Sequence, residues 1–451
     1  MSSPRFLRRA LTFALPLLLL FSRPAAAGLM ADSTMSDRWK LANGLEVRVR
    51  HVPGASGVAI VVAYRAGTSY EPAGREGLAQ LLAELQYHSA AGDIPERTRE
   101  EMGSLRPLGW GVQVNERHAT LTEIAAPDRY AGVLHQVATR MKGVQPTAAD
   151  LKQAADDVRG DLALRHFGRA DLGLYYRVRE LARGANDEQL LRLSSAAGLK
   201  AVTLAEATAA LQKLYAPANA SLAIAGDLGE VDVRALVERE FGSIPGGTAQ
   251  PEAAAAMLQP VSRATPFSGL DHTIGCVGVF APAIEDSLHP AFFLSMVITG
   301  PWFTNALGRP NPPLSSRFSY SIYDEADLVR FYPEPRPGET APGALGSQLA
   351  AQLDKLAETT MERDLFETVR RSVAWLLGGD LTKAVKDQMR KQPGALGTLA
   401  NGMAARALWK GDAFWDEYLL RFQTTNRGHS TFYSWLTDPQ HQAALLFTPK
   451  P

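Results

Sequence analysis

Residues 214–245 show the clearest order of structural elements in this chain. A turn, Tyr215-Ala-Pro-Ala-Asn219, ends one helical stretch and leads into the short apolar run 221–225. That run stops at Gly226-Asp227, and a second helical stretch then ends at a glycine and a proline. A short apolar run between helices, bounded by Gly and Pro, is typical of a buried strand that continues into a helix. The segment therefore predicts a sheet covered by helices.

The residues before this block predict further strands and helices of the same structure. Runs rich in Val, Ile and Tyr predict strands, and a turn at Pro53-Gly54 separates the first two. A helix-like period of apolar residues predicts helices, one of them capped by Asp128. The expected strands are 41–51, 57–66 and 111–125, and the expected helices are 77–87, 128–142 and 148–166.

The chain of 451 residues is too long for one ordinary core, so we expect at least two domains. Residues 246–266 are rich in Gly, Pro and Ala and predict a linker. Beyond it we expect a strand at 273–280, helices at 291–298, 349–358, 362–377 and within 378–436, and a last strand at 443–447. An aromatic group within the last helical region predicts core packing: Trp409, Phe414, Trp415, Tyr418 and Phe422.

Residues 67–84 carry a resemblance to the pitrilysin/insulinase metallopeptidases, the inverzincins. That family places the zinc motif H-x-x-E-H directly after Gly-Leu-Ala, and Gly67, Thr68, Glu71 and Gly77-Leu-Ala79 fit its pattern. The blocks Asn43-Gly-Leu45, Tyr215-x-Pro-x-Asn219 and Phe241-Gly-x-Ile-Pro245 also match the family. The chain is therefore identified as resembling a family member through its whole N-terminal half.

The resemblance implies a fold and a domain division. We expect an α+β protein in which two homologous α/β domains, each an antiparallel sheet flanked by helices, form a clam-like scaffold. The expected segments are a signal peptide at 1–27, an N-terminal peptidase-like domain at 36–246, a linker at 247–266 and a C-terminal peptidase-like domain at 267–451.

The resemblance also places Gln80, Ala83 and Glu84 where the family has His, Glu and His. The third ligand, a Glu that the family has about 76 residues further on, falls on Asp161. An amide is a poor zinc ligand and a methyl group cannot take a proton from a metal-bound water. We therefore expect an inactive homologue that has lost the zinc cofactor of the active family.

Other positions leave alternatives open. Gln80, Glu84 and His88 recur every fourth residue, so with Asp161 they form the one candidate for an altered metal site. The alternative is that they are polar groups lining an empty cleft.

The family binds extended peptides by strand addition at a sheet edge. The segment 115–122 resembles that edge strand, so Asn115 and Thr120 are candidate peptide contacts. The family also uses an Arg and a Tyr of its second domain to bind substrate. Arg317 in the segment 314–318 is the candidate match for the Arg, and Tyr320, Tyr323 and Tyr332 are the tyrosines nearby.

Charge and the N-terminus bear on location. The 47 basic and 47 acidic residues cancel, which gives no electrostatic reason to expect nucleic acid or an anionic membrane as a partner. Arg5, Arg8 and Arg9, then the apolar run 10–21 and Ala25-Ala-Ala27, have the three parts of a secretory signal peptide. We expect a soluble periplasmic or secreted protein.

Cys276 is the only cysteine, so no internal disulfide forms, and its apolar surroundings predict a core residue.

Three functions follow as hypotheses. The first is a non-catalytic partner subunit that completes the peptide-binding chamber of an active, zinc-bearing homologue as a heterodimer. The second is a metallopeptidase with an altered metal site. The third is a stand-alone peptide-binding or chaperone-like protein that pairs with itself.

Overall fold

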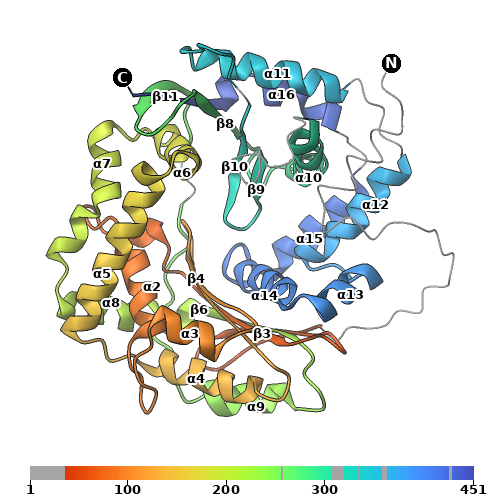
Figure 1. The fold of residues 1–451 in the computed structure, drawn as a ribbon. Coiled ribbons are helices and arrows are strands. Elements are labelled where there is room, and N and C mark those ends of the chain that lie inside the picture. Colours follow the sequence, from red (N-terminus) through yellow and green to blue (C-terminus); the bar gives the residue numbers. More distant parts are fainter. Residues whose placement is uncertain are drawn as a thin grey trace.

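The structure is a computed structural model that describes residues 36–254, 257–306, 318–333, 335–357, 363–425 and 429–450. Two β-sheets organise these residues (Figure 1). The first has six strands in the order β1-β2-β6-β3-β5-β4 and the second has five in the order β7-β11-β8-β10-β9. The strands are β1 Ser36–Lys40, β2 Glu46–His51, β3 Val58–Tyr64, β4 Trp110–Val114, β5 Ala119–Ala125, β6 Ala220–Gly226, β7 Val261–Phe267, β8 Ile274–Phe280, β9 Phe318–Ser321, β10 Glu325–Phe331 and β11 Gln442–Pro449.

Helices cover both faces of both sheets, which confirms the expected mixed α and β structure (Figure 1). The sheets were expected to be antiparallel, but each contains one parallel pair, β2 with β6 and β7 with β11. The first half of the chain contains α2 Leu78–His88, α3 Arg99–Leu105, α4 Tyr130–Lys142, α5 Ala148–Ala163, α6 Ala170–Ala182, α7 Asp187–Ser195, α8 Leu204–Leu214 and α9 Val233–Phe241. The second half contains α10 His289–Ala306, α11 Gly343–Ala357, α12 Arg363–Val373, α13 Lys383–Lys391, α14 Pro393–Leu408, α15 Gly411–Thr424 and α16 Tyr433–Thr437. Short helical turns include η2 Leu164–Gly168 and η5 Ala374–Leu377.

Strand β3 shows why the first sheet has two cores. All seven of its residues are buried, as expected for a continuous apolar run in the middle of a covered sheet. Val58, Ile60 and Val62 pack with α2, α4, α8 and α9, while the alternate residues Val61 and Ala63 pack with α14. The period of two along a strand thus divides its side chains between two helical layers.

Each half of the chain contributes a helix to the sheet of the other half. Helix α14, from the second half, packs its Leu396, Leu399 and Met403 on the first sheet. Helix α6, from the first half, packs Leu174 and Val178 on the second sheet. Figure 1 shows α14 between the first sheet and α15. The two halves are therefore joined by exchanged helices as well as by the connecting chain.

The other face of the second sheet packs on α10, α11 and α16. Helices α10, α12 and α15 form a further cluster that contains Trp409, Trp415, Tyr418 and Phe422, with Phe414 packed against it. The prediction that these aromatic residues belong to a core is confirmed. Cys276 is likewise fully buried beside α6, and burial raises the pKa of its thiol to about 12.

Some boundaries differ from those expected. Residues 261–267, which overlap the expected linker, form strand β7, which pairs with β11. The N-cap of α4 is Arg129 instead of Asp128. The helix expected at 148–166 ends at Ala163 and passes into the π-helical turn η2. In the part of the chain described, no helix combines the length and the apolar character needed to cross a membrane.

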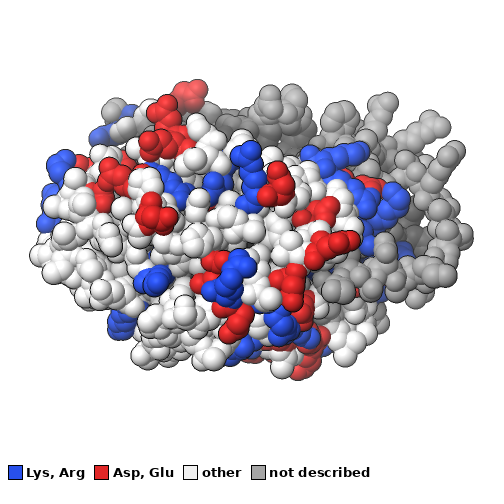
Figure 2. Space-filling model, turned by 90° about the horizontal axis from the view of Figure 1, so that it is seen from below, with Lys and Arg blue, Asp and Glu red and all other residues white. Residues whose placement is uncertain are grey.

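Basic and acidic side chains are interspersed on the molecular face seen in Figure 2. This mixture agrees with the equal numbers of basic and acidic residues in the sequence.

Candidate functional site

Helix α2 carries the candidate site, and local contacts fix where it begins. Its N-cap Gly77 has φ 92°, a left-handed conformation that favours glycine. The carboxylate of Glu71 accepts a hydrogen bond of 2.8 Å from the backbone N–H of Ala79, in the first turn. Every residue from Leu78 to Tyr87 is buried. The helix expected at 77–87 is therefore confirmed and is packed into the core.

Glu84 lies at the centre of a polar cluster on α2. Its Oε1 accepts hydrogen bonds from Gln80 Nε2 at 2.9 Å and from Arg99 Nη2 at 2.5 Å. Its Oε2 lies 3.4 Å from His88 Nε2. Both carboxylate oxygens of this side chain, which is only 4% exposed, therefore have polar neighbours.

The surroundings of Glu84 favour its ionised form. Burial acts to raise the pKa of Glu84, but the neighbouring His88 and the charge of Arg99 outweigh it, so the pKa lies below its ordinary value. The Nδ1 atom of His88 is 2.7 Å from the carbonyl oxygen of Arg97. Because a carbonyl only accepts, Nδ1 donates this bond and Nε2 is left facing Glu84. The cluster is an internal ion pair in which Arg99 supplies the cation.

Ala83 and Asp161 are placed differently. The methyl group of Ala83 is fully buried in the apolar core between α2 and the first sheet, so this position offers no proton acceptor. Asp161 lies on α5, which packs against α2, and its side chain is 40% exposed. Its Oδ2 is 2.5 Å from Arg165 Nη2, one turn further along the chain.

A search of the described residues finds no group of three or more His, Cys, Asp or Glu side chains arranged to hold a metal ion. The altered metal site would use Gln80, Glu84, His88 and Asp161. Gln80 donates its amide N–H to Glu84, Glu84 is paired with Arg99, and Asp161 is paired with Arg165. Carboxylates neutralised by guanidinium groups are poor ligands for a second cation. The geometry therefore gives this alternative no support.

The expected sheet edge requires a correction. Strand β5 contains Thr120 and pairs with β3 on one side and β4 on the other, so residues 115–122 do not form the edge. The terminal strand on this side is β4. The prediction was wrong because both strands of a hairpin have the same local pattern, and only the tertiary pairing decides which one is outermost.

The candidate peptide contacts Asn115 and Thr120 both contact other residues of this chain. Thr120 is buried, opposite Gln113 of β4. Asn115 lies in the turn between the two strands, where its Oδ1 accepts from the N–H groups of Arg117 and His118 at 2.8 Å each. Its Nδ2 donates to Asp324 of the second half at 2.8 Å. Asn115 therefore joins the two halves.

Arg317 lies outside the described residues. The three tyrosines near it pack within the second half of the chain. Tyr320 donates to the carbonyl of Ala326 at 3.0 Å, Tyr323 donates to the carbonyl of Leu376, and Tyr332 is 3% exposed.

Sequence reasoning missed three residues that shape this region. Arg99 is the first residue of α3, whose capping box of Thr98 and Glu101 is visible in the sequence and predicts a helix start there. Trp110 of the terminal strand β4 stacks on Tyr87 of α2, with ring centroids 5.6 Å apart. Gln113 of β4 accepts a hydrogen bond from Asn401 of α14 at 3.2 Å. No local signal connects Gln113 with Asn401.

Comparisons with known proteins agree with this architecture. A family profile described as the peptidase M16 inactive domain matches residues 201–301. A search among curated proteins finds no significant match. The chain resembles a protease from Helicobacter pylori with a TM-score of 0.70 and 15% identity, covering 92% of this chain and 100% of that one.

Two further solved structures are similar in the same way. The periplasmic protease PqqL from Escherichia coli gives a TM-score of 0.62 at 15% identity and covers 94% of this chain, which matches 48% of that protein. A peptidase M16 inactive domain from Pseudomonas fluorescens gives 0.59 at 12% identity, covering 92% of this chain and 98% of that one. At such identities the likeness shows the fold, which is that of one clamshell half of an M16-type peptidase. The matched segment of 101 residues is similar to the M16 inactive-domain profile, and the fold of the chain is similar to that of M16-type peptidases.

Proposed function

We propose that this protein is an exported, non-catalytic member of the M16 family that binds extended peptide as the partner subunit of a zinc-bearing homologue. The observation that carries the proposal is the ion pair between Glu84 and Arg99. In this proposal Gln80, Ala83 and Glu84 stand where active relatives have H-x-x-E-H, and a guanidinium takes the place of the metal cation.

The loss of catalysis rests on three positions. Ala83 offers no group to activate a water molecule, Glu84 is held by Arg99, and Asp161 is held by Arg165. The similarity to a profile and to a structure described as inactive domains supports the same proposal.

The partner role rests on size. The chain matches 48% of PqqL, so PqqL is about twice as long as the region that it shares with this chain. We propose that a zinc-bearing homologue supplies the second half of the chamber. The terminal strand β4 is then the edge to which a peptide adds, because a sheet edge binds the main chain of a peptide without regard to its sequence.

Export rests on the sequence pattern of residues 1–27, which lie outside the described part of the chain. The proposed location is the periplasm, which is also where PqqL is described to act. N-terminal sequencing of the protein recovered from a periplasmic extract tests this, and we expect a mature chain that begins near Gly28.

The function is tested with the mature protein alone and mixed with a zinc-bearing M16 homologue from the same cell. We expect the protein alone to contain no stoichiometric zinc and to leave a quenched, unstructured peptide intact. We expect the mixture to co-purify and to cleave the peptide faster than the homologue alone. Stoichiometric zinc with chelator-sensitive cleavage by the protein alone would contradict the proposal. A homodimer that binds the peptide but does not bind the homologue would favour a stand-alone role.

A further inference from the structure

A small polar cavity of about 110 Å³ lies where strand β2 meets the helices of the second half. It is separate from the cluster on α2 and from strand β4. Side chains from β2, η5, α14 and α15 line it, among them Arg48, Arg50, Trp375, Arg406 and Asp412.

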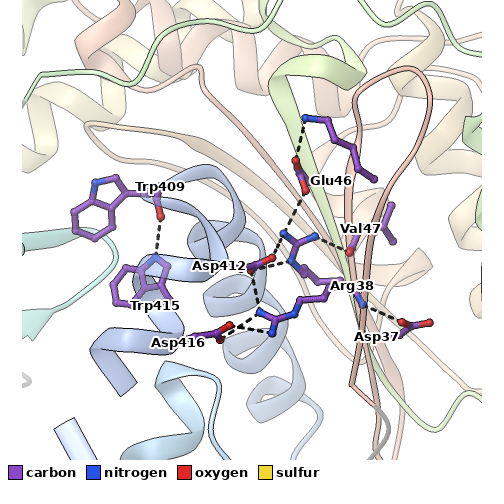
Figure 3. A network of polar contacts seen from close by, with 10 residues as sticks. Asp37, Arg38, Glu46, Val47, Trp409, Asp412, Trp415 and Asp416 are labelled. Carbon is purple, nitrogen blue, oxygen red and sulfur yellow. Dashed lines mark hydrogen bonds and ion pairs between the residues drawn. The ribbon is translucent and has the colours of Figure 1, made fainter. Parts of the chain in front are cut away.

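One wall of the cavity is a network of paired charges, drawn in Figure 3. Arg48 Nη2 is 2.7 Å from Asp412 Oδ2 and 3.2 Å from Glu46 Oε2. Arg38 Nη2 is 2.9 Å from Asp416 Oδ2, and Arg38 Nη1 donates to Oδ1 of the same residue at 3.2 Å. These carboxylates are therefore engaged by Arg38 and Arg48, and they tie β1 and β2 to α15.

Arg50 lines the same cavity without such a partner. Residues 48 and 50 point to the same face of β2, opposite to Val47 and Val49, which pack with the outer helices. Arg50 is only 7% exposed, and its Nε and Nη2 atoms are buried with no hydrogen-bond partner among the described residues. Burial lowers the pKa of the Arg50 guanidinium, and Arg406 lowers it further, whereas Asp380 opposes them. A guanidinium nevertheless stays charged in proteins.

Two more cavity-lining residues add to the positive character. The indole Nε1 of Trp375 is a buried donor with no partner in the described part of the chain. Arg406 Nη1 donates to the hydroxyl of Tyr323 at 2.9 Å and to the carbonyl of Leu376, both of which are neutral groups. The cavity is lined by four arginines and three aspartates, and in the described part of the chain Arg50 and Arg406 are the two of these arginines without a carboxylate partner.

An unpaired buried guanidinium and an unpaired buried indole N–H both cost free energy, and an anion accepting from them removes that cost. The volume equals that of a few water molecules at about 30 Å³ each, which is enough for one small anion. We propose that this cavity is a binding site for a small oxyanion, with Arg50 and Trp375 as its principal donors. Phosphate and a carboxylate share this chemistry, because both offer several oxygen acceptors to a guanidinium.

Occupancy of this site links the two halves of the chain. Arg50 belongs to the first sheet, whereas Trp375 and Arg406 belong to the second half. An oxyanion bound between them contacts the folded protein only, so it raises the melting temperature as its concentration rises above the dissociation constant.

The test uses the mature protein in phosphate, acetate or chloride at equal pH and ionic strength, with thermal unfolding and equilibrium dialysis of radiolabelled phosphate as readouts. We expect one phosphate to bind per chain and to raise the melting temperature above that in chloride. A matching rise in acetate would show that a carboxylate suffices, and a rise in phosphate alone would show a preference for tetrahedral oxyanions.

The variants decide where the anion binds. Arg50→Met removes the charge at similar volume, and we expect phosphate affinity to fall by at least about ten-fold. Trp375→Phe removes one neutral donor, and we expect a loss of about three-fold to ten-fold. Arg140→Met is the matched control, because Arg140 is 3% exposed, has the same two unpartnered nitrogens and does not line this cavity. We expect the control to bind phosphate like the unmodified protein.

The proposal is overturned if phosphate and chloride have the same effect and dialysis detects no bound phosphate. It is also overturned if Arg140→Met loses the binding while Arg50→Met keeps it. Trp375→Phe keeps the charge of the site and an aromatic ring in the core. If Arg50→Met does not fold, the phosphate affinity of Trp375→Phe tests the assignment. Unchanged phosphate binding in Trp375→Phe would contradict it.

Discussion

Glu84 makes the polar cluster on α2 sensitive to acid. Its pKa in the folded protein lies below the ordinary 4.5, so the ionised group stabilises the fold above that pH. This stability is lost as the pH falls through the lowered folded pKa. We expect Glu84→Gln to remove this part of the acid dependence and to lower the free energy of unfolding at pH 7 by about 1 kcal/mol.

Urea unfolding between pH 3 and pH 7 measures the effect of Glu84→Gln. Glu100→Gln is the control, because Glu100 is an exposed carboxylate next to Arg99 on α3. An unchanged acid dependence in Glu84→Gln would show that Arg99 does not hold a buried carboxylate.

Glu71 is expected to act in the opposite direction. Burial raises its pKa to about 7, although the N–H groups of Ala79 and Gly77 partly oppose the shift. Because the folded pKa is the higher one, the contribution of Glu71 is complete below about pH 4.5 and is lost as the pH rises through about 7. The whole shift corresponds to about 3 kcal/mol, and we expect about 2 kcal/mol because the side chain keeps some contact with solvent.

Glu71→Gln keeps an acceptor for the start of α2 but does not ionise. We expect it to raise the free energy of unfolding at pH 8 and to flatten the decline between pH 4.5 and pH 8. The exposed Glu230→Gln serves as control, measured by the same urea titrations. A variant less stable than the unmodified protein at pH 8 would refute the raised pKa.

At the scale of elements, helices α2, α3 and α5 together decide whether a metal site can be restored. Gln80→His, Ala83→Glu and Glu84→His would rebuild H-x-x-E-H on α2, but Arg99 would still lie beside position 84 and Arg165 would still pair with Asp161. We expect this triple variant to bind zinc poorly. Adding Asp161→Glu, Arg99→Leu and Arg165→Leu is expected to raise zinc affinity at least about ten-fold, because two competing cations are removed.

Competition with a coloured chelator measures zinc affinity in both sets of variants. The triple variant with Arg129→Leu serves as control for the loss of an arginine elsewhere. Equal zinc binding by the triple variant with and without Arg99 and Arg165 would show that the ion pairs do not block the site.

The packing of α14 on the first sheet gives a prediction for the core. Leu396 is fully buried between α14 and the sheet, so Leu396→Ala is expected to cost about 2–5 kcal/mol of unfolding free energy. Leu420→Ala on α15 is the control, since that side chain is 60% exposed and its loss should cost less than about 0.5 kcal/mol. Denaturant unfolding measures both, and a cost of less than about 1 kcal/mol for Leu396→Ala would contradict the packing.

Local patterns in the sequence predicted much of the fold at this scale. The apolar run of β3, the turn at Gly226 and the periodicity of α2 each depend on neighbours in sequence, so their elements were predicted to within a few residues. The order of strands was harder, and β5 was taken for the edge because a hairpin gives no sign of which strand lies outside. The pairing of Asp161 with Arg165 was not predicted, although a spacing of four residues on a helix permits it.

At the scale of the whole molecule, the contacts that sequence reasoning missed join residues on separate elements, and two of them cross between the halves. Arg99 lies 15 residues beyond Glu84, and Asn115 meets Asp324 at a separation of 209 residues. The exchange of α6 and α14 could not be predicted from local sequence either, because the apolar face of a helix does not specify which sheet covers it. Long-range pairing of this kind follows from packing the complete chain, and local propensity does not contain it.

The exchanged helices make a prediction for a chain divided in the region between the sheets. The fragment 36–254 would lack α14, which covers Val61, Ala63 and Ala223 of its sheet, and the fragment 257–450 would lack α6, which covers Leu445 and Phe447. Each fragment would therefore expose an apolar sheet face that the complete protein buries. We expect each fragment alone to aggregate or to lack cooperative unfolding, and the two co-expressed fragments to form a 1:1 complex with a cooperative transition.

Size-exclusion chromatography and thermal unfolding of the separate and co-expressed fragments measure this outcome. Leu396→Ala in the second fragment should weaken the complex, while Leu420→Ala should not, because only Leu396 lies in the exchanged interface. Two fragments that each fold as stable, cooperative monomers would show that the halves are independent domains, and that α6 and α14 are dispensable for their cores. A complex that forms only between the fragments would instead show that the exchanged helices hold the two halves in one folding unit.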